Sequence, residues 1–346
     1  MSSTLDSHPR AKRPRKDEAV EVVRSKIWYP DGTVVLQAES TQFRVYGGFL
    51  AARSTVFRDM FAVGQAPSGE DCEVDGAPLV DLYDDKAADV EQLLDALYDW
   101  NFSKAPQKSF AQVSAMWRLG KKYGFDDLRN DAQQRLEACY PPTLAAYRKH
   151  QLGVKTSTLV EPVIGYVGMW VDAVKLARET GLLSILPAAL YLSTNKTSQR
   201  DIHEEILHGV SAPDGQRFQL SEGDKAVCIL ATFELIKRQW EGPYKWVTGG
   251  WALHSAGSYK CTGNYKCREV FDTAKSCLGG LIPDVDPLGP TIRGATGLCA
   301  ACLENVTAVV RKEEEKLWQD LPGIYGLPSW DEINKEMERI SGPAST

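Results

Sequence analysis

The chain has 346 residues, of which 43% are hydrophobic and 25% charged, which suits a folded protein with room for about two domains. Its longest apolar run, residues 163–171, is less than half of the ~20 residues that a membrane-spanning helix needs. Residues 1–22 are too polar for a signal peptide, and eight cysteines are too few for a disulfide scaffold. Composition therefore argues against secreted, membrane and collagen-like proteins and favours a reduced intracellular compartment.

The net charge of −6 is unevenly distributed along the chain. Residues 1–22 carry five basic and four acidic side chains, a net of +1, so the remaining residues carry −7. Because an acidic body repels phosphate, we expect no direct nucleic-acid binding. The tail lacks aromatic residues and apolar periodicity, which predicts disorder. It holds a compact basic cluster that is either a nuclear-import signal or a solvated tail: Lys12, Arg13, Arg15 and Lys16.

Residues 23–140 predict a short sheet with a group of helices. Strand-forming residues at 34–38 and 42–45 flank a short turn, as in a β-hairpin. Apolar residues then recur at helical spacing from Phe49 to Phe61, and Ser54 is placed to cap the second of two short helices. A loop at 64–76 and a strand at 79–83 precede three helical stripes at 90–98, 110–123 and 128–139. Mixed strands and helices without regular alternation predict an α+β domain.

The order of residues in this region resembles that of a BTB/POZ domain. The matching stretches are residues 43 and 50–61, residues 79–82, residues 93–98, and residues 119–136. The resemblance implies a protein-interaction module that forms a homodimer, with these residues at the interface: Trp28, Val34, Leu36, Tyr46, Phe49 and Leu50. In many members a histidine and a basic residue stand where this chain has Tyr46 and Gly47, so the charged pocket of transcription-linked members is altered here.

Residues 141–346 predict a mainly helical second domain. Apolar stripes with helical spacing begin near Trp170, Val306 and Trp330, and Ser221 with Asp224 forms a capping-box pattern. Residues 317–330 resemble the C-terminal segment of BTB-domain proteins from mushroom-forming fungi, a segment to which we attach no catalytic activity.

Cysteines gather in the loop region 254–302 of this second domain. Cys299 and Cys302 form a C-x2-C pair, and Cys261 and Cys267 form a C-x5-C pair upstream, with His254 and Cys277 nearby. Four thiolates suit a tetrahedral structural zinc site, which leaves no coordination position for water. The C-x5-C spacing is looser than is usual in zinc sites, which argues against a metal. The alternative is that these cysteines are buried core thiols.

The sequence contains no convincing catalytic motif, so we expect that the protein is not an enzyme. In residues 203–208, HEEILH, two histidines five positions apart lie about 140° from one another around a helix and cannot share a metal. The leading interpretation is a dimerising scaffold or transcription-linked regulator in the nucleus. The alternative is a substrate adaptor of a cullin-type ubiquitin ligase, for which the loop at 62–73 offers Glu70 and Glu73 without the expected apolar neighbour. A third interpretation, a metalloenzyme, would need a metal site with a coordination position left open for water or substrate.

Overall fold

The chain divides by its internal contacts into two compact units, Met1–Tyr98 and Asp99–Thr346. This computed structural model describes residues 21–63, 73–99, 105–156, 162–194, 199–248, 261–279, 287–288 and 297–341. The first unit is an α+β arrangement and the second is mainly helical, as the sequence predicts, but the contacts divide the chain after Tyr98 and not after the predicted residue 140. Among the described residues, no helix combines the length and apolar content that crossing a membrane takes.

A five-stranded sheet forms the frame of the first unit, in the order β1-β3-β2-β5-β4. Its strands are β1 (Val23–Trp28), β2 (Val34–Ala38), β3 (Thr41–Val45), β4 (Glu73–Val74) and β5 (Ala77–Asp81). β2 and β3 pair as the antiparallel hairpin that alternation predicts, whereas β1 joins β3 in parallel and β5 joins β2 in parallel. The core side chains of the hairpin are fully buried, since β-branched and aromatic residues pack well on a pleated surface.

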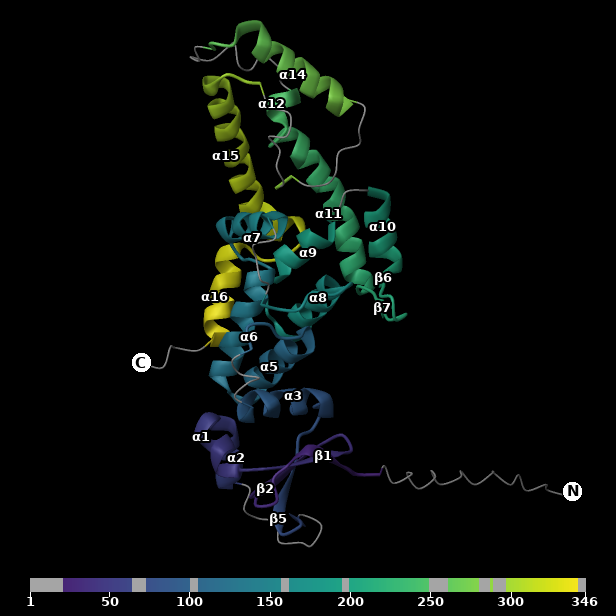
Figure 1. The fold of residues 1–346 in the computed structure, drawn as a ribbon, viewed down its shortest axis with the longest axis vertical. Coiled ribbons are helices and arrows are strands. Elements are labelled where there is room, and N and C mark those ends of the chain that lie inside the picture. Colours follow the sequence, from purple (N-terminus) through teal and green to yellow (C-terminus); the bar gives the residue numbers. More distant parts are fainter. Residues whose placement is uncertain are drawn as a thin grey trace, which may run out of the picture. The chain divides into compact units, whose positions relative to one another are not determined.

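Three helices accompany this sheet: α1 (Gly47–Arg53), α2 (Thr55–Val63) and α3 (Ala87–Tyr98) (Figure 1). Ser54 separates α1 from α2, and its hydroxyl accepts a hydrogen bond from the backbone N–H of Phe57 at 2.9 Å, which confirms it as the predicted cap. The predicted strand at 79–83 is shifted, because the ladder with β2 ends at Asp81. Trp28 was expected to precede the first strand, but it is the last residue of β1.

The second unit begins with a helical group that periodicity largely predicts. Its first helices are α5 (Phe110–Tyr123), α6 (Asp126–Cys139), α7 (Leu144–Thr156), α8 (Met169–Thr180), α9 (Leu186–Thr194) and α10 (Gln199–His208). Gly120 brings α5 close to α6, because a Cβ at this position would lie 3.1 Å from the backbone nitrogen of Arg129. The indole N–H of Trp117 donates to the hydroxyl of Thr180 at 2.7 Å and joins α5 to α8. Gly181, with φ of +76°, ends α8 as predicted.

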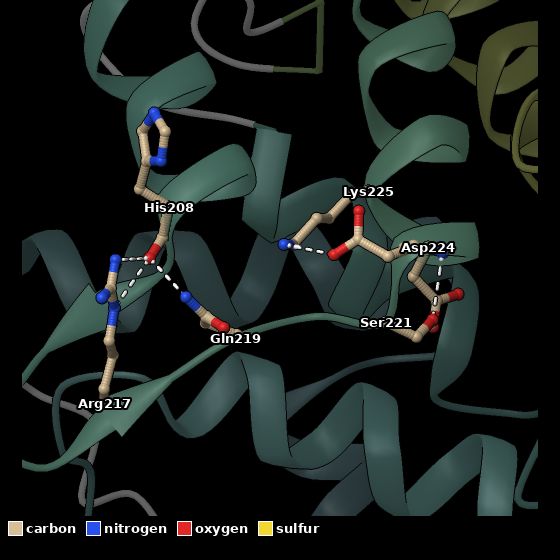
Figure 2. A network of polar contacts seen from close by, with 7 residues as sticks. His208, Arg217, Gln219, Ser221, Asp224 and Lys225 are labelled. Atoms are coloured by element: carbon tan, nitrogen blue, oxygen red, sulfur yellow. Dashed lines mark hydrogen bonds and ion pairs between the residues drawn. The ribbon is translucent and has the colours of Figure 1, made fainter.

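A short hairpin of β6 (Val210–Ser211) and β7 (Arg217–Phe218), which the sequence does not predict, connects α10 to α11 (Glu222–Glu241). Figure 2 shows how polar groups close both helix ends at this connection. Arg217 and Gln219 donate to the backbone carbonyl of His208, which ends α10. The hydroxyl of Ser221 accepts from the backbone N–H of Asp224, so Ser221 is the cap that its spacing predicts.

The last helices of this unit are α12 (Lys245–Thr248), α14 (Asn264–Gly279), α15 (Ala300–Ile324) and α16 (Trp330–Ser341). A small apolar core lies among α12, α14 and α15, and its buried members are Trp246, Val247, Phe271, Ala274, Val306 and Val310. Among the described residues these six buried side chains make up the core, with Tyr244 and Leu298 packed against it. Additional contacts at the helix ends therefore matter for holding this group together.

Candidate functional site

The four cysteines of the two predicted pairs meet at the N-terminal ends of α14 and α15. Cys261 lies just before α14, and Cys267 lies in the first turns of that helix. Cys299 is the N-cap residue of α15, and Cys302 lies within its first turn. Helix N-termini present unpaired N–H groups and a partial positive charge, so both helices favour anionic sulfur at this place.

The sulfur atoms are close enough for one ion. All four Sγ atoms lie within 4.8 Å of one another, and those of Cys261 and Cys299 are 3.8 Å apart. A tetrahedral zinc ion with Zn–S bonds of about 2.3 Å separates its sulfurs by about 3.8 Å. The distance is too long for a disulfide, whose S–S bond is about 2.05 Å, and all four thiols are free. These cysteines can therefore hold a metal ion.

Backbone and side-chain donors surround the sulfurs. The backbone N–H of Cys302 and donors of Thr262 and Gly263 point to the Cys299 sulfur and lower the pKa of that thiol to about 5, against a smaller opposing effect of burial. The backbone N–H of Cys299 donates in turn to the Sγ of Cys267 at 3.2 Å. Burial raises the pKa values of Cys267 and Cys302. N–H donors directed at sulfur stabilise thiolates, the form in which cysteine binds metals.

Gly263 leaves room for this arrangement. A Cβ on Gly263 would lie 2.3 Å from the Sγ of Cys267 and 3.3 Å from the Cβ of Cys299. Only a residue without a side chain lets the segment between Cys261 and α14 approach so closely. This glycine was not singled out in the sequence, because its close approach to the sulfurs depends on the folded position of the segment.

Exposure divides the cluster into two pairs. Cys267 and Cys302 are buried, whereas Cys261 and Cys299 are partly exposed. Of the two further groups that the sequence places nearby, His254 lies outside the described residues, and the side chain of Cys277 is not described. Within the part of the chain that the structure describes, these four cysteines are the one group of metal-ligating side chains that converge.

The HEEILH segment lies in α10, apart from this cluster. His208 is 65% exposed by its side chain and lies 3.7 Å from Glu204, one turn earlier. The side chain of His203 is outside the described residues. A surface contact of this kind is common on helices and contributes little.

The residues expected at a dimer interface fall into two groups in the first unit. Val34, Leu36 and Leu50 are buried in the core of their own unit, so in this conformation they are not available to a partner. Trp28, Tyr46 and Phe49 are half-buried at its surface. Of the six residues expected at the interface, these three aromatic residues remain accessible to a partner.

Two of these surface residues, Tyr46 and Phe49, belong to an aromatic cluster. The ring of Tyr98 lies 4.7 Å from that of Phe49 and 5.4 Å from that of Tyr29, and Tyr29 lies 5.2 Å from Tyr46. Burial raises the pKa of Tyr98 to about 12. The guanidinium of Arg24 lies 4.4 Å from the ring of Trp28, a cation–π contact on β1.

Tyr46 has a specific polar partner in this cluster. Its hydroxyl donates to a carboxylate oxygen of Asp31 at 2.8 Å, and this bond raises the pKa of Tyr46. The backbone N–H of Gly47 donates to the hydroxyl of Thr33 at 2.9 Å. A phenol hydrogen-bonded to a carboxylate therefore occupies the place where the resemblance implies a histidine and a basic residue. The basic cluster at Lys12, Arg13, Arg15 and Lys16 lies outside the described residues.

Comparison with known protein families identifies a BTB/POZ domain at residues 29–139. The matched stretch begins after β1, includes the other four strands and the helices of the first unit, and continues into α5 and α6 of the second. No curated protein and no solved structure matches the chain. The likeness of residues 317–330 to fungal BTB proteins therefore stays a prediction.

Proposed function

We propose, from the BTB/POZ domain that the chain carries at residues 29–139, that it is a non-catalytic scaffold that binds a second copy of itself. BTB/POZ domains mediate protein–protein interaction, and often do so as dimers. This family match is the observation that carries the proposal. A two-fold interface requires one self-complementary patch, which a single exposed surface of the domain supplies.

Two features of the first unit support self-association. β1 is an edge strand, and Val22 just before it and Val23 at its start are 50% and 55% exposed. Trp28 at the end of β1 and the surface aromatic residues Tyr46 and Phe49 add large apolar side chains, which are enriched at interfaces. An edge strand with exposed β-branched residues favours pairing with another chain.

Sedimentation equilibrium of the full chain tests this proposal. We expect Phe49→Ala to weaken self-association by about tenfold or more, as truncation of an interface aromatic residue does. Tyr83→Ala is the matched control, because Tyr83 is 78% exposed and lies away from the three surface aromatics in sequence. Equal association of both variants and the wild type would contradict the proposed surface, and a strictly monomeric wild type would contradict the dimer.

The cullin-adaptor alternative depends on the loop after α2, of which residues 64–72 lie outside the described residues. No observation favours it over the scaffold. Stoichiometric binding of a purified cullin by the full chain would establish the alternative.

The basic cluster in the tail supports a nuclear location for this scaffold. Import receptors recognise short runs of lysine and arginine in an exposed chain. Replacing Lys12, Arg13, Arg15 and Lys16 together with alanine should move a fluorescent fusion of the full chain out of the nucleus. An unchanged nuclear signal would contradict this assignment.

The four-cysteine cluster supports a second proposal, a structural zinc site that fastens α14 to α15. The 3.8 Å separation of Cys261 and Cys299 fits the edge of a zinc tetrathiolate, and a cluster of several irons would hold its thiolates farther apart. Four protein ligands leave no position for water, so such a site stabilises the fold and performs no catalysis. The small core among α12, α14 and α15 is what it would complete.

Metal analysis of the purified full chain tests the zinc site. We expect about one zinc per chain for the wild type and for Cys228→Ser, and much less for Cys267→Ser. Cys228 and Cys267 are both fully buried, so the two variants are matched in burial and chemistry. A wild type that holds no more zinc than Cys267→Ser would contradict the proposal.

A further inference from the structure

Two of the four clustered sulfurs are placed differently from the other two. Cys261 and Cys299 are partly exposed and their Sγ atoms are 3.8 Å apart, whereas Cys267 and Cys302 are 0% and 2% exposed. A small oxidant in solution therefore has access to one pair of residues and is kept from the other. The exposed pair also links the two helices, because Cys261 precedes α14 and Cys299 caps α15.

We infer that Cys261 and Cys299 form an oxidation site at which a hydroperoxide converts the zinc tetrathiolate into a disulfide. This inference rests on the proposed zinc site and names its regulation. A zinc-bound thiolate is already deprotonated and nucleophilic, so the reaction needs no prior ionisation.

The reaction takes two steps that balance in atoms and electrons. The Cys299 thiolate attacks one oxygen of hydrogen peroxide, the O–O bond breaks, and the products are a Cys299 sulfenic acid and hydroxide. The Cys261 thiolate then attacks the Cys299 sulfur, an S–S bond forms, the S–O bond breaks, and a second hydroxide leaves. Two protons turn the hydroxides into water. The two thiolates lose two electrons in total, and the peroxide gains them.

The geometry favours this pair over the others. To form an S–S bond of about 2.05 Å, the two sulfurs need to approach by about 1.8 Å. Cys261 belongs to no helix, so its backbone can make this adjustment without unwinding α14. Cys302 lies inside the first turn of α15 and Cys267 inside α14, and both are shielded from the oxidant.

The product differs from the starting site in a measurable way. Of the four clustered cysteines, Cys267 and Cys302 remain as thiols, and two ligands are too few for a structural zinc site, so the ion is released. The disulfide connects the same two helix ends that the metal connected. The oxidised chain should therefore keep its helices while it loses its zinc.

The test treats the zinc-loaded full chain with hydrogen peroxide, follows released zinc with a chromogenic chelator, and maps disulfides by mass spectrometry after non-reducing digestion. We expect one zinc released per disulfide, Cys261 joined to Cys299, alkylatable Cys267 and Cys302, and an unchanged helical circular dichroism spectrum. A thiol reductant with added zinc should restore the metal. Cys228→Ser is the control and should release zinc at the wild-type rate.

Several outcomes would overturn the inference. A dominant disulfide between any other pair, or zinc release accompanied by sulfinic acid without a disulfide, contradicts the assigned pair. Loss of the helical spectrum along with the zinc contradicts the covalent replacement of the metal. A chain that takes up no zinc before oxidation contradicts the proposed zinc site instead, and disulfide mapping of that metal-free chain still tests the pairing of Cys261 with Cys299.

Discussion

The indole rings of Trp318 and Trp330 stack with their centroids 5.6 Å apart and an angle of 8° between their planes. The Nε1–H of Trp330 also donates to the backbone carbonyl of Trp318 at 2.7 Å. Trp318 lies in α15 and Trp330 is the first residue of α16, so one buried pair fixes where α16 begins. The Ser329 hydroxyl and the Glu332 carboxylate cap the same end of the helix.

Trp330→Ala should destabilise the second unit by about 3–5 kcal/mol, because it removes a buried indole and leaves a cavity beside Trp318. Trp330→Phe should cost less, since a ring remains but the hydrogen bond to the Trp318 carbonyl is lost. Urea unfolding followed by circular dichroism measures both. A loss of less than about 1 kcal/mol for Trp330→Ala would show that the stacked pair does not anchor α16.

Removing the proposed zinc ion should loosen the small core next to the cysteines. Trp246 is 3% exposed and its ring lies 5.7 Å from that of Phe271, so its fluorescence reports on this core. A strong zinc chelator should shift the emission of the full chain to longer wavelength, and Trp246→Phe should abolish most of that shift. An identical emission shift in both proteins would show that the shift comes from tryptophans other than Trp246.

Gly263→Ala should weaken zinc binding by about 10–100-fold, as changes that displace ligands of a metal site do. The new methyl group would lie 2.3 Å from the Sγ of Cys267, so either the loop or the sulfur must move. Gly323→Ala is the matched control, because a Cβ there meets nothing within 4 Å. Competition with a chromogenic zinc chelator measures both affinities, and equal values for the two variants would contradict the close approach.

Asp31→Ala should lower the pKa of Tyr46, because the carboxylate at present holds the proton on the phenol. The folded pKa of Tyr46 lies above its ordinary value near 10. This hydrogen bond therefore adds stability below that ordinary value, and the contribution is lost as the pH rises through the folded pKa. NMR titration of labelled tyrosine, assigned with Tyr46→Phe, measures the shift. An unchanged pKa in Asp31→Ala would exclude the bond in solution.

The sequence predicts most of the elements whose formation depends on residues close together in the chain. The hairpin of β2 and β3, the cap at Ser54 and the cap at Ser221 all follow from residues within a few positions of one another. The strand β1 was missed because Ile27 is the one buried residue among its six, so the segment carries no alternating apolar pattern.

The candidate sites, too, were predictable where they depend on sequence spacing and not where they depend on packing. The C-x2-C and C-x5-C spacings were enough to select the four cysteines that the fold brings together. Spacing does not reveal which sulfurs are buried, nor that Gly263 must lack a side chain, because both depend on how α14 meets α15. The burial of Val34, Leu36 and Leu50 likewise depends on the packing of the whole first unit, since an apolar residue in a strand suits a core and an interface equally.

Above all, we propose that the BTB/POZ domain of this chain binds a second copy of itself. Native mass spectrometry of the full chain at micromolar concentration tests it most directly, because the mass of each species counts its chains. We predict that the wild type is mainly a species of two chains. The Phe49→Ala variant should dissociate into single chains on dilution. A single-chain species at every concentration of the wild type would contradict the account.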